Sequence, residues 1–205
     1  ICNYNIDNIS LAICDLLRAE NCREDVYIRP LAYKDNLKLG SRLDHLDDAI
    51  LTWVTPITDD SRYERGLKVT ISDTRRINAD AVPSEAKLTG TYINPIIART
   101  TAQIAGYDDC ILLNSLGNLA EGSGWNILLI KDQTLVTPAL GEGILEGLTR
   151  DTLLSMARLE LNLKIEEREV TPEELFSADE IIACGTGIQI LPIVEIDEKK
   201  IGDGC

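Results

Sequence analysis

Short apolar runs joined by polar turns fill the second half of the sequence, and this pattern limits the fold more than any other feature. The turn candidates at 114–117 and 131–133 separate runs that are typical of strands. Amphipathic helical spacing precedes and follows them. The predicted strands are 110–113, 118–120, 126–130 and 135–137, and the predicted helices are 92–105 and 149–161. Hairpins interrupted by helices favour a mixed α+β domain over a doubly wound parallel sheet.

The first part of the chain has a pattern of its own. Helical spacing covers 8–19, with Asn8 or Ser10 as the expected cap, and strand-like runs follow at 26–33, 49–54 and 67–72. The stretch 74–85 has little apolar periodicity, which is typical of a linker.

The end of the chain returns to alternating elements. Thr171 and Glu174 have the spacing of a capping box, so a short helix should start there, and strands are expected at 180–184 and 189–196. We therefore expect an N-terminal domain over residues 1–73, a linker over 74–85 and a C-terminal domain over 86–205.

Charge and cysteine content exclude several classes of function. Thirty-four acidic and 20 basic residues give a net charge of -14, which repels nucleic acids and anionic membrane surfaces. No apolar run approaches the ~20 residues of a membrane span, so we expect a soluble protein, and the scattered cysteines favour reduced thiols and hence the cytoplasm. The six cysteines form no CxxC pair, which argues against a zinc site. The single histidine, His45, lies in a charged stretch typical of solvated surface.

Four segments carry a more specific signal through their order and spacing. Neither GxGxxG nor GxxxxGK[ST] is present, so the two commonest nucleotide motifs are absent. The four segments are Ala86-Lys87-Leu88-Thr89-Gly90-Thr91-Tyr92, Leu119-Ala120-Glu121-Gly122-Ser123-Gly124-Trp125-Asn126, Leu145-Glu146-Gly147-Leu148-Thr149-Arg150 and Cys184-Gly185-Thr186-Gly187. Together they resemble the class IV aminotransferases, and within that family the branched-chain amino acid aminotransferases. The resemblance implies a two-domain fold, with a small N-terminal α/β domain, partial here, and a larger mixed α+β domain.

The resemblance also implies pyridoxal phosphate as the cofactor. Lys87 takes the position of the lysine that bonds covalently to the cofactor and then moves a proton between the substrate Cα and the cofactor. A lysine suits both tasks because a partly desolvated amine loses its proton readily. Glu121 takes the position of the carboxylate that keeps the ring nitrogen protonated, and Tyr92 that of the phenol beside the cofactor's 3′-oxygen.

The remaining assignments concern the phosphate and the substrate. Leu148 and Thr149 precede a predicted helix, whose amino end attracts a phosphate. Thr186 resembles a second phosphate-binding element, and with Gly187 it would also bind the substrate carboxylate. Tyr27 and Arg29 are two apart on a predicted strand, so they share a face. In the family this Tyr-x-Arg-Pro element binds the substrate carboxylate.

The implied activity is the transamination of L-leucine, L-isoleucine and L-valine with 2-oxoglutarate, by an enzyme that forms a homodimer or a larger homo-oligomer. A D-amino-acid aminotransferase or an aminodeoxychorismate lyase is the enzymatic alternative. The family's upstream region, which supplies an arginine to the cofactor phosphate, is missing, so we expect an N-terminally truncated member. A non-catalytic paralogue or fragment is the alternative from another class. Trp125 also replaces the family's usual glutamate.

Overall fold

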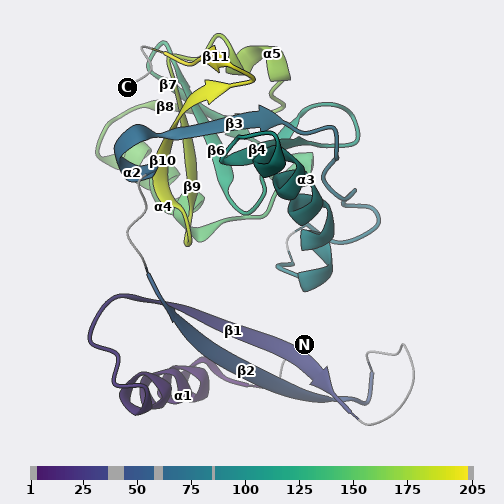
Figure 1. Cartoon of the computed structure of the whole chain (residues 1–205), viewed down its shortest axis with the longest axis vertical. Coiled ribbons are helices and arrows are strands. Elements are labelled where there is room, and N and C mark those ends of the chain that lie inside the picture. The colour runs from purple at the N-terminus through teal and green to yellow at the C-terminus, as the bar shows by residue number, and fades with distance from the viewer. Residues whose placement is uncertain (1–3, 37–43, 58–61, 85, 203–205) are drawn as a thin grey trace. The chain divides into compact units, whose positions relative to one another are not determined.

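The computed structural model describes residues 4–36, 44–57, 62–84 and 86–202 of the chain (Figure 1). Two compact units are separated between Asp60 and Ser61. The expected domain limits of the complete protein stay a prediction. However, the strand at 67–71, which we had grouped with the N-terminal domain, belongs to the sheet of the second unit.

The first unit consists of helix α1 (Ile6–Ala19) and the antiparallel strands β1 (Val26–Asp35) and β2 (Asp47–Pro56). The helix begins two residues earlier than predicted because Asn5, and not Asn8 or Ser10, is its N-cap. The Asn5 side chain accepts a hydrogen bond of 2.8 Å from the Asn8 backbone N–H, which satisfies one of the free donors of the first turn.

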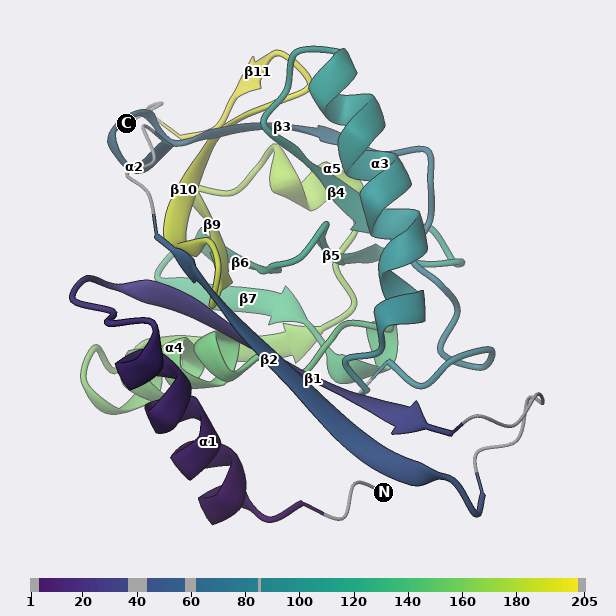
Figure 2. The ribbon, with the colours of Figure 1, turned by 60° about the horizontal axis from the view of Figure 1, so that its bottom comes forward.

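The second unit is built on one large mixed sheet, which curls around its core (Figure 2). Neighbouring strands follow the order β5-β4-β3-β10-β9-β6-β7-β8, and β11 pairs with β10. Pairs β3 with β4, β3 with β10, and β7 with β8 are parallel, and the other pairs are antiparallel. The strands are β3 (Leu67–Ile71), β4 (Asp109–Leu113), β5 (Leu119–Gly122), β6 (Asn126–Lys131), β7 (Thr134–Pro138), β8 (Lys164–Arg168), β9 (Glu180–Gly185), β10 (Gln189–Ile196) and β11 (Lys199–Lys200).

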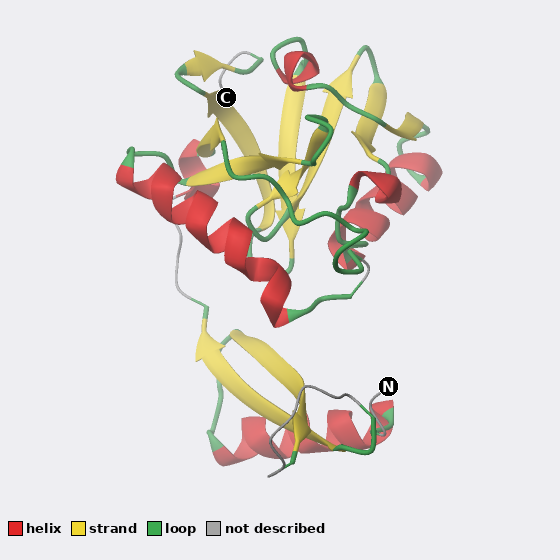
Figure 3. Cartoon of the chain, turned by 90° about the vertical axis from the view of Figure 1, so that its right-hand side faces the viewer, coloured by secondary structure: helices red, strands yellow, loops and turns green. Residues whose placement is uncertain are grey.

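Helices and short helical turns connect the strands of this sheet (Figure 3). They are α2 (Arg62–Arg65), η1 (Thr89–Tyr92), α3 (Ile93–Ile104), η2 (Leu140–Glu142), α4 (Leu148–Leu159) and α5 (Pro172–Leu175). No helix within the described ranges has the length and apolar content needed to cross a membrane.

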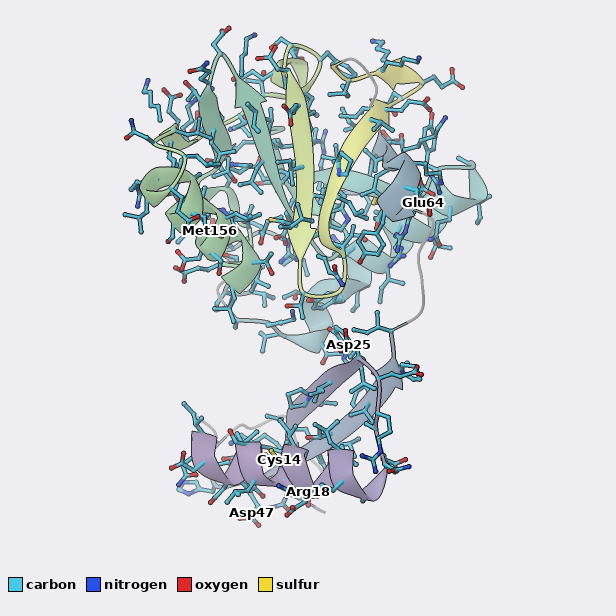
Figure 4. The ribbon with its side chains drawn as sticks, turned by 90° about the vertical axis from the view of Figure 1, so that its left-hand side faces the viewer. Cys14, Arg18, Asp25, Asp47, Glu64 and Met156 are labelled. Carbon is cyan, nitrogen blue, oxygen red and sulfur yellow. The ribbon has the colours of Figure 1, made fainter. Side chains whose placement is uncertain are left out.

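Side chains alternate between the two faces of the sheet, so one face packs on the main core and the other packs against a helix. In β4, Ile111 and Leu113 face the main core, whereas Cys110 and Leu112 pack against α3, because residues two apart in a strand share a face. Figure 2 shows α3 alongside β4. Leu128 of β6 likewise faces α4. The face of α4 turned away from the sheet carries the half-exposed Met156 (Figure 4).

The mixed α+β architecture and most of the predicted elements are confirmed. The capping box of Thr171 and Glu174 is present at the start of α5, and Gly106 follows α3 with a φ of 94°, a conformation that glycine adopts without strain. We missed β8 because its sequence, Lys-Ile-Glu-Glu-Arg, is too charged to give an apolar pattern.

Candidate active site

A cavity of about 260 Å³ opens in the second unit where the four sequence segments meet. A fifth contributor, Arg76, reaches it from the stretch we had predicted to be a linker. The predicted site residues that line the cavity are Lys87, Tyr92, Glu121, Leu148, Thr149 and Thr186. Gly187 lies one residue beyond, in the turn between β9 and β10, and is absent from the lining.

Lys87 is held on a tight turn before η1. The Leu88 N–H donates to the Ala86 carbonyl at 2.8 Å, so Lys87 is the central residue of a γ-turn. The turn continues into η1, where the Thr91 hydroxyl donates to the Leu88 carbonyl at 2.8 Å. Lys87 is exposed and Tyr92 is half-buried. Both side chains are therefore accessible from the cavity.

Glu121 is buried, and three groups hold its carboxylate. Its Oε1 lies 2.7 Å from Arg76 Nε in an ion pair. Its Oε2 accepts hydrogen bonds from the Leu145 backbone N–H at 3.0 Å and from Asn126 Nδ2 at 3.1 Å. The carboxylate thus has a fixed orientation at the wall of the cavity.

Burial raises the pKa of Glu121, because a charged carboxylate loses its hydration inside the protein. The charge of Arg76, the Leu145 N–H and, more weakly, the charge of Lys87 act in the opposite direction. Glu121 consequently holds a proton more readily than an exposed glutamate does. Such a group can share a proton with a basic atom in the cavity.

Arg76 also organises the lysine turn. It is buried, and its Nη1 donates to the Thr91 carbonyl at 3.1 Å while its Nε pairs with Glu121. The same guanidinium thus ties η1 to the ring of contacts around Glu121. Sequence reasoning missed this residue because the partners lie far apart in the chain. Its only signal was a pair of arginines, Arg75 and Arg76, in a stretch without apolar periodicity.

The start of α4 forms another wall. The helix begins at Leu148, with Gly147 as its N-cap, and Gly147 supplies no side chain to cap it. Backbone N–H groups of a first helical turn lack partners within the helix and lie at the positive end of the helix dipole. Leu148 and Thr149 can therefore present donors to an anionic group. Thr186 also lines the cavity and is exposed in the turn that follows β9.

Tyr27 and Arg29 lie on β1 in the first unit. They occupy the same face of the strand, as predicted, since they are two residues apart. The Arg29 guanidinium carbon lies 5.5 Å from the centre of the Trp53 ring, and Trp53 is its cross-strand neighbour. This cation–π contact restrains the arginine.

The polar groups that line the cavity include one amine, one phenol, one guanidinium, one amide, the carboxyl of Glu121 with its raised pKa, hydroxyls and backbone N–H groups. No group of three or more His, Cys, Asp or Glu side chains in the described part of the chain could hold a metal ion. These groups suit a ligand with three features: a carbonyl that can react with the amine, a basic atom that can share a proton with the carboxyl, and an anionic end that can bind at the start of the helix.

Comparisons with known proteins agree with this chemistry. The family model for amino-transferase class IV matches residues 2–196. A probable branched-chain-amino-acid aminotransferase of Aquifex aeolicus is 40% identical, and the alignment covers 98% of this chain and 65% of that protein. The chain thus spans about two thirds of the length of this relative.

Two solved structures have the same fold. The branched-chain aminotransferase from the archaeon Thermoproteus uzoniensis, crystallised with norvaline, matches with a TM-score of 0.93 and 35% identity, over 100% of this chain and 68% of that one. The branched-chain amino acid aminotransferase of Thermobaculum terrenum in its PLP form matches with a TM-score of 0.88 and 36% identity. The match covers 97% of this chain and 64% of that one.

Proposed function

The chain belongs to the class IV aminotransferase family, and we propose that it supplies the cofactor-binding part of a branched-chain amino acid aminotransferase. The observation that carries the proposal is the meeting of Lys87, Glu121 and the start of α4 at one cavity. Pyridoxal phosphate is the cofactor of this family. When bound, its aldehyde bonds to an amino group and its ring accepts the electrons released as the substrate Cα loses a proton.

The residues of the cavity fit this cofactor. We propose that Lys87 forms the covalent bond to it and moves the proton to and from the substrate Cα. The buried Glu121 would keep the ring nitrogen protonated, and the hydroxyl of Tyr92 would donate to the ring oxygen. The N–H groups of Leu148 and Thr149, with Thr186, would hold the phosphate.

The proposed substrates are L-leucine, L-isoleucine and L-valine, with 2-oxoglutarate as the amino acceptor. Support comes from the similarity to branched-chain aminotransferases over nearly the whole chain. We propose that Tyr27, Arg29, Thr186 and Gly187 bind the substrate carboxylate, because a phenol, a guanidinium and backbone N–H groups are suitable donors for it.

We further propose that the enzyme is cytoplasmic and forms a homodimer or larger homo-oligomer. The described cysteines Cys14, Cys22, Cys110 and Cys184 are free, as expected in a reducing compartment.

A covalent-trapping experiment tests the role of Lys87. The complete protein is incubated with pyridoxal phosphate, its absorbance is recorded, and borohydride reduction followed by peptide mapping locates the attached cofactor. We expect a visible absorption band in the native protein, and a cofactor label on Lys87. Lys87→Ala should abolish both, because no other amine lies at the cavity among the described residues.

The matched control is Lys131→Ala, which removes an exposed lysine from the hairpin between β6 and β7 and should leave band and label unchanged. A label that persists elsewhere in the Lys87→Ala protein would refute the assignment. Rates with L-leucine, D-alanine and aminodeoxychorismate then decide the substrate. Turnover of D-alanine or aminodeoxychorismate without turnover of L-leucine would favour the other branches of the family.

A further inference from the structure

Asn126 is buried between the two parts of the cavity that contain Glu121 and the start of α4. Its Nδ2 donates to Glu121 Oε2 at 3.1 Å and to the Leu145 carbonyl at 2.9 Å. The Leu145 N–H donates to the same Glu121 oxygen at 3.0 Å. These three hydrogen bonds form a closed ring, which we call the Asn126 latch.

The latch accounts for the glycine at the N-cap of α4. A Cβ added at Gly147 would overlap Asn126 Oδ1 and lie only 3.2 Å from Asn126 Cγ, whereas the Arg150 Cβ would be at an ordinary 3.7 Å. The backbone at Gly147 has φ -78° and ψ 131°, a conformation open to any L-residue. Glycine is therefore needed here for close packing against Asn126 and not for an unusual backbone.

We propose that Asn126 is a positioning residue that sets the spacing between the carboxylate of Glu121 and the phosphate-binding start of α4. This inference rests on the proposed function. A cofactor that is anchored at both ends gains affinity only when its two subsites are held at the matching separation, because the second contact is then made without further loss of freedom. The latch supplies that constraint, and of its members only Glu121 is proposed to bind the cofactor; Asn126 acts through Glu121 and the start of α4.

Two ligands that differ in the phosphate test whether the two subsites are held at the matching separation. The ratio of the dissociation constants of pyridoxal and pyridoxal phosphate, measured by absorbance titration of the complete protein, reports how much the phosphate contributes. In Asn126→Ala we expect pyridoxal phosphate to bind roughly 10- to 100-fold more weakly, as the loss of hydrogen bonds to a charged group implies. The dissociation constant of pyridoxal divided by that of pyridoxal phosphate should fall about tenfold. The reason is that binding of the ring at Glu121 no longer places the phosphate at the start of α4.

Asn114→Ala is the matched control. Asn114 donates to Glu142 at 2.7 Å and accepts from the Leu116 and Asn118 N–H groups, and it does not line the cavity. This variant should lose thermal stability while the ratio stays at the native value. A purely structural role of Asn126 predicts the same behaviour for both variants and would overturn the inference.

A double-mutant cycle between positions 126 and 147 gives a second test, by thermal denaturation without cofactor. Gly147→Ala should be strongly destabilising in the native background and nearly neutral when combined with Asn126→Ala, since the overlap with Oδ1 is then removed. Additive effects would contradict the latch. If the native protein binds neither ligand, the proposed function fails; if it binds both and the ratio is unchanged in Asn126→Ala, only the latch fails.

Discussion

The ion pair of Arg76 and Glu121 makes a single-residue prediction about pH. Arg76→Met removes the charge and keeps most of the side-chain volume, so Glu121 loses its nearest positive group and its pKa should rise further. At neutral pH the carboxylate is then buried without its ionic partner, and the free energy of unfolding should fall by about 3 to 5 kcal/mol. Urea denaturation of the cofactor-free protein measures this.

The sign of the pH dependence follows from the raised pKa. The folded protein binds the Glu121 proton more tightly than the unfolded chain does, so the loss should be larger at alkaline pH, where the carboxyl is ionised, than at acidic pH, where it is protonated. The control Arg18→Met, which breaks the pair of Arg18 with Asp15 in which both side chains are exposed, should cost under about 1 kcal/mol. A pH dependence that survives in the double variant Arg76→Met with Glu121→Gln would show that another group is responsible.

Single residues also mark the limit of sequence reasoning. Lys87 and Glu121 could be identified because each stands in a short segment that resembles a family motif. The cavity does bring both together. Arg76 and Asn126 were assigned no role, since their contacts connect residues brought together only by the fold. A buried arginine and a buried asparagine have no local pattern that distinguishes them from exposed ones.

At the scale of elements, Arg150 anchors the first turn of α4. It is buried and donates to the Pro138 carbonyl at 3.1 Å, to Glu167 at 2.8 Å and to Thr137 Oγ1 at 3.3 Å, so it joins α4 to β7 and β8. Arg150→Ala should lower the free energy of unfolding by about 2 to 4 kcal/mol, because buried acceptors lose their donor. Guanidinium denaturation measures the loss.

The control on the same helix is Arg158→Ala, in the exposed last turn of α4, which should cost under about 1 kcal/mol. Since Arg150 also fixes the start of α4, its variant should bind pyridoxal phosphate more weakly than the Arg158 variant does. Equal affinities would show that the start of the helix keeps its position without this anchor.

Elements with strong local patterns were predictable. The hairpins of the second unit and the helices α3 and α4 follow from apolar periodicity and turn residues. The order of strands in the sheet could not be predicted, because β3 pairs with β4 and β10, which come from distant parts of the chain. The parallel strand β8 was missed since four of its five residues are charged, and its place depends on α4 returning the chain beside β7.

At the scale of the whole molecule, the net charge of -14 opposes folding through repulsion among acidic groups. Added salt screens this repulsion, so raising the ionic strength from about 0.01 to about 0.5 M should raise the melting temperature, even though it also weakens exposed ion pairs. Those pairs, such as Arg65 with Asp108 and Arg168 with Glu174, contribute little each. Thermal denaturation in sodium chloride measures the balance. A melting temperature that falls with salt would mean that the surface ion pairs outweigh the net repulsion.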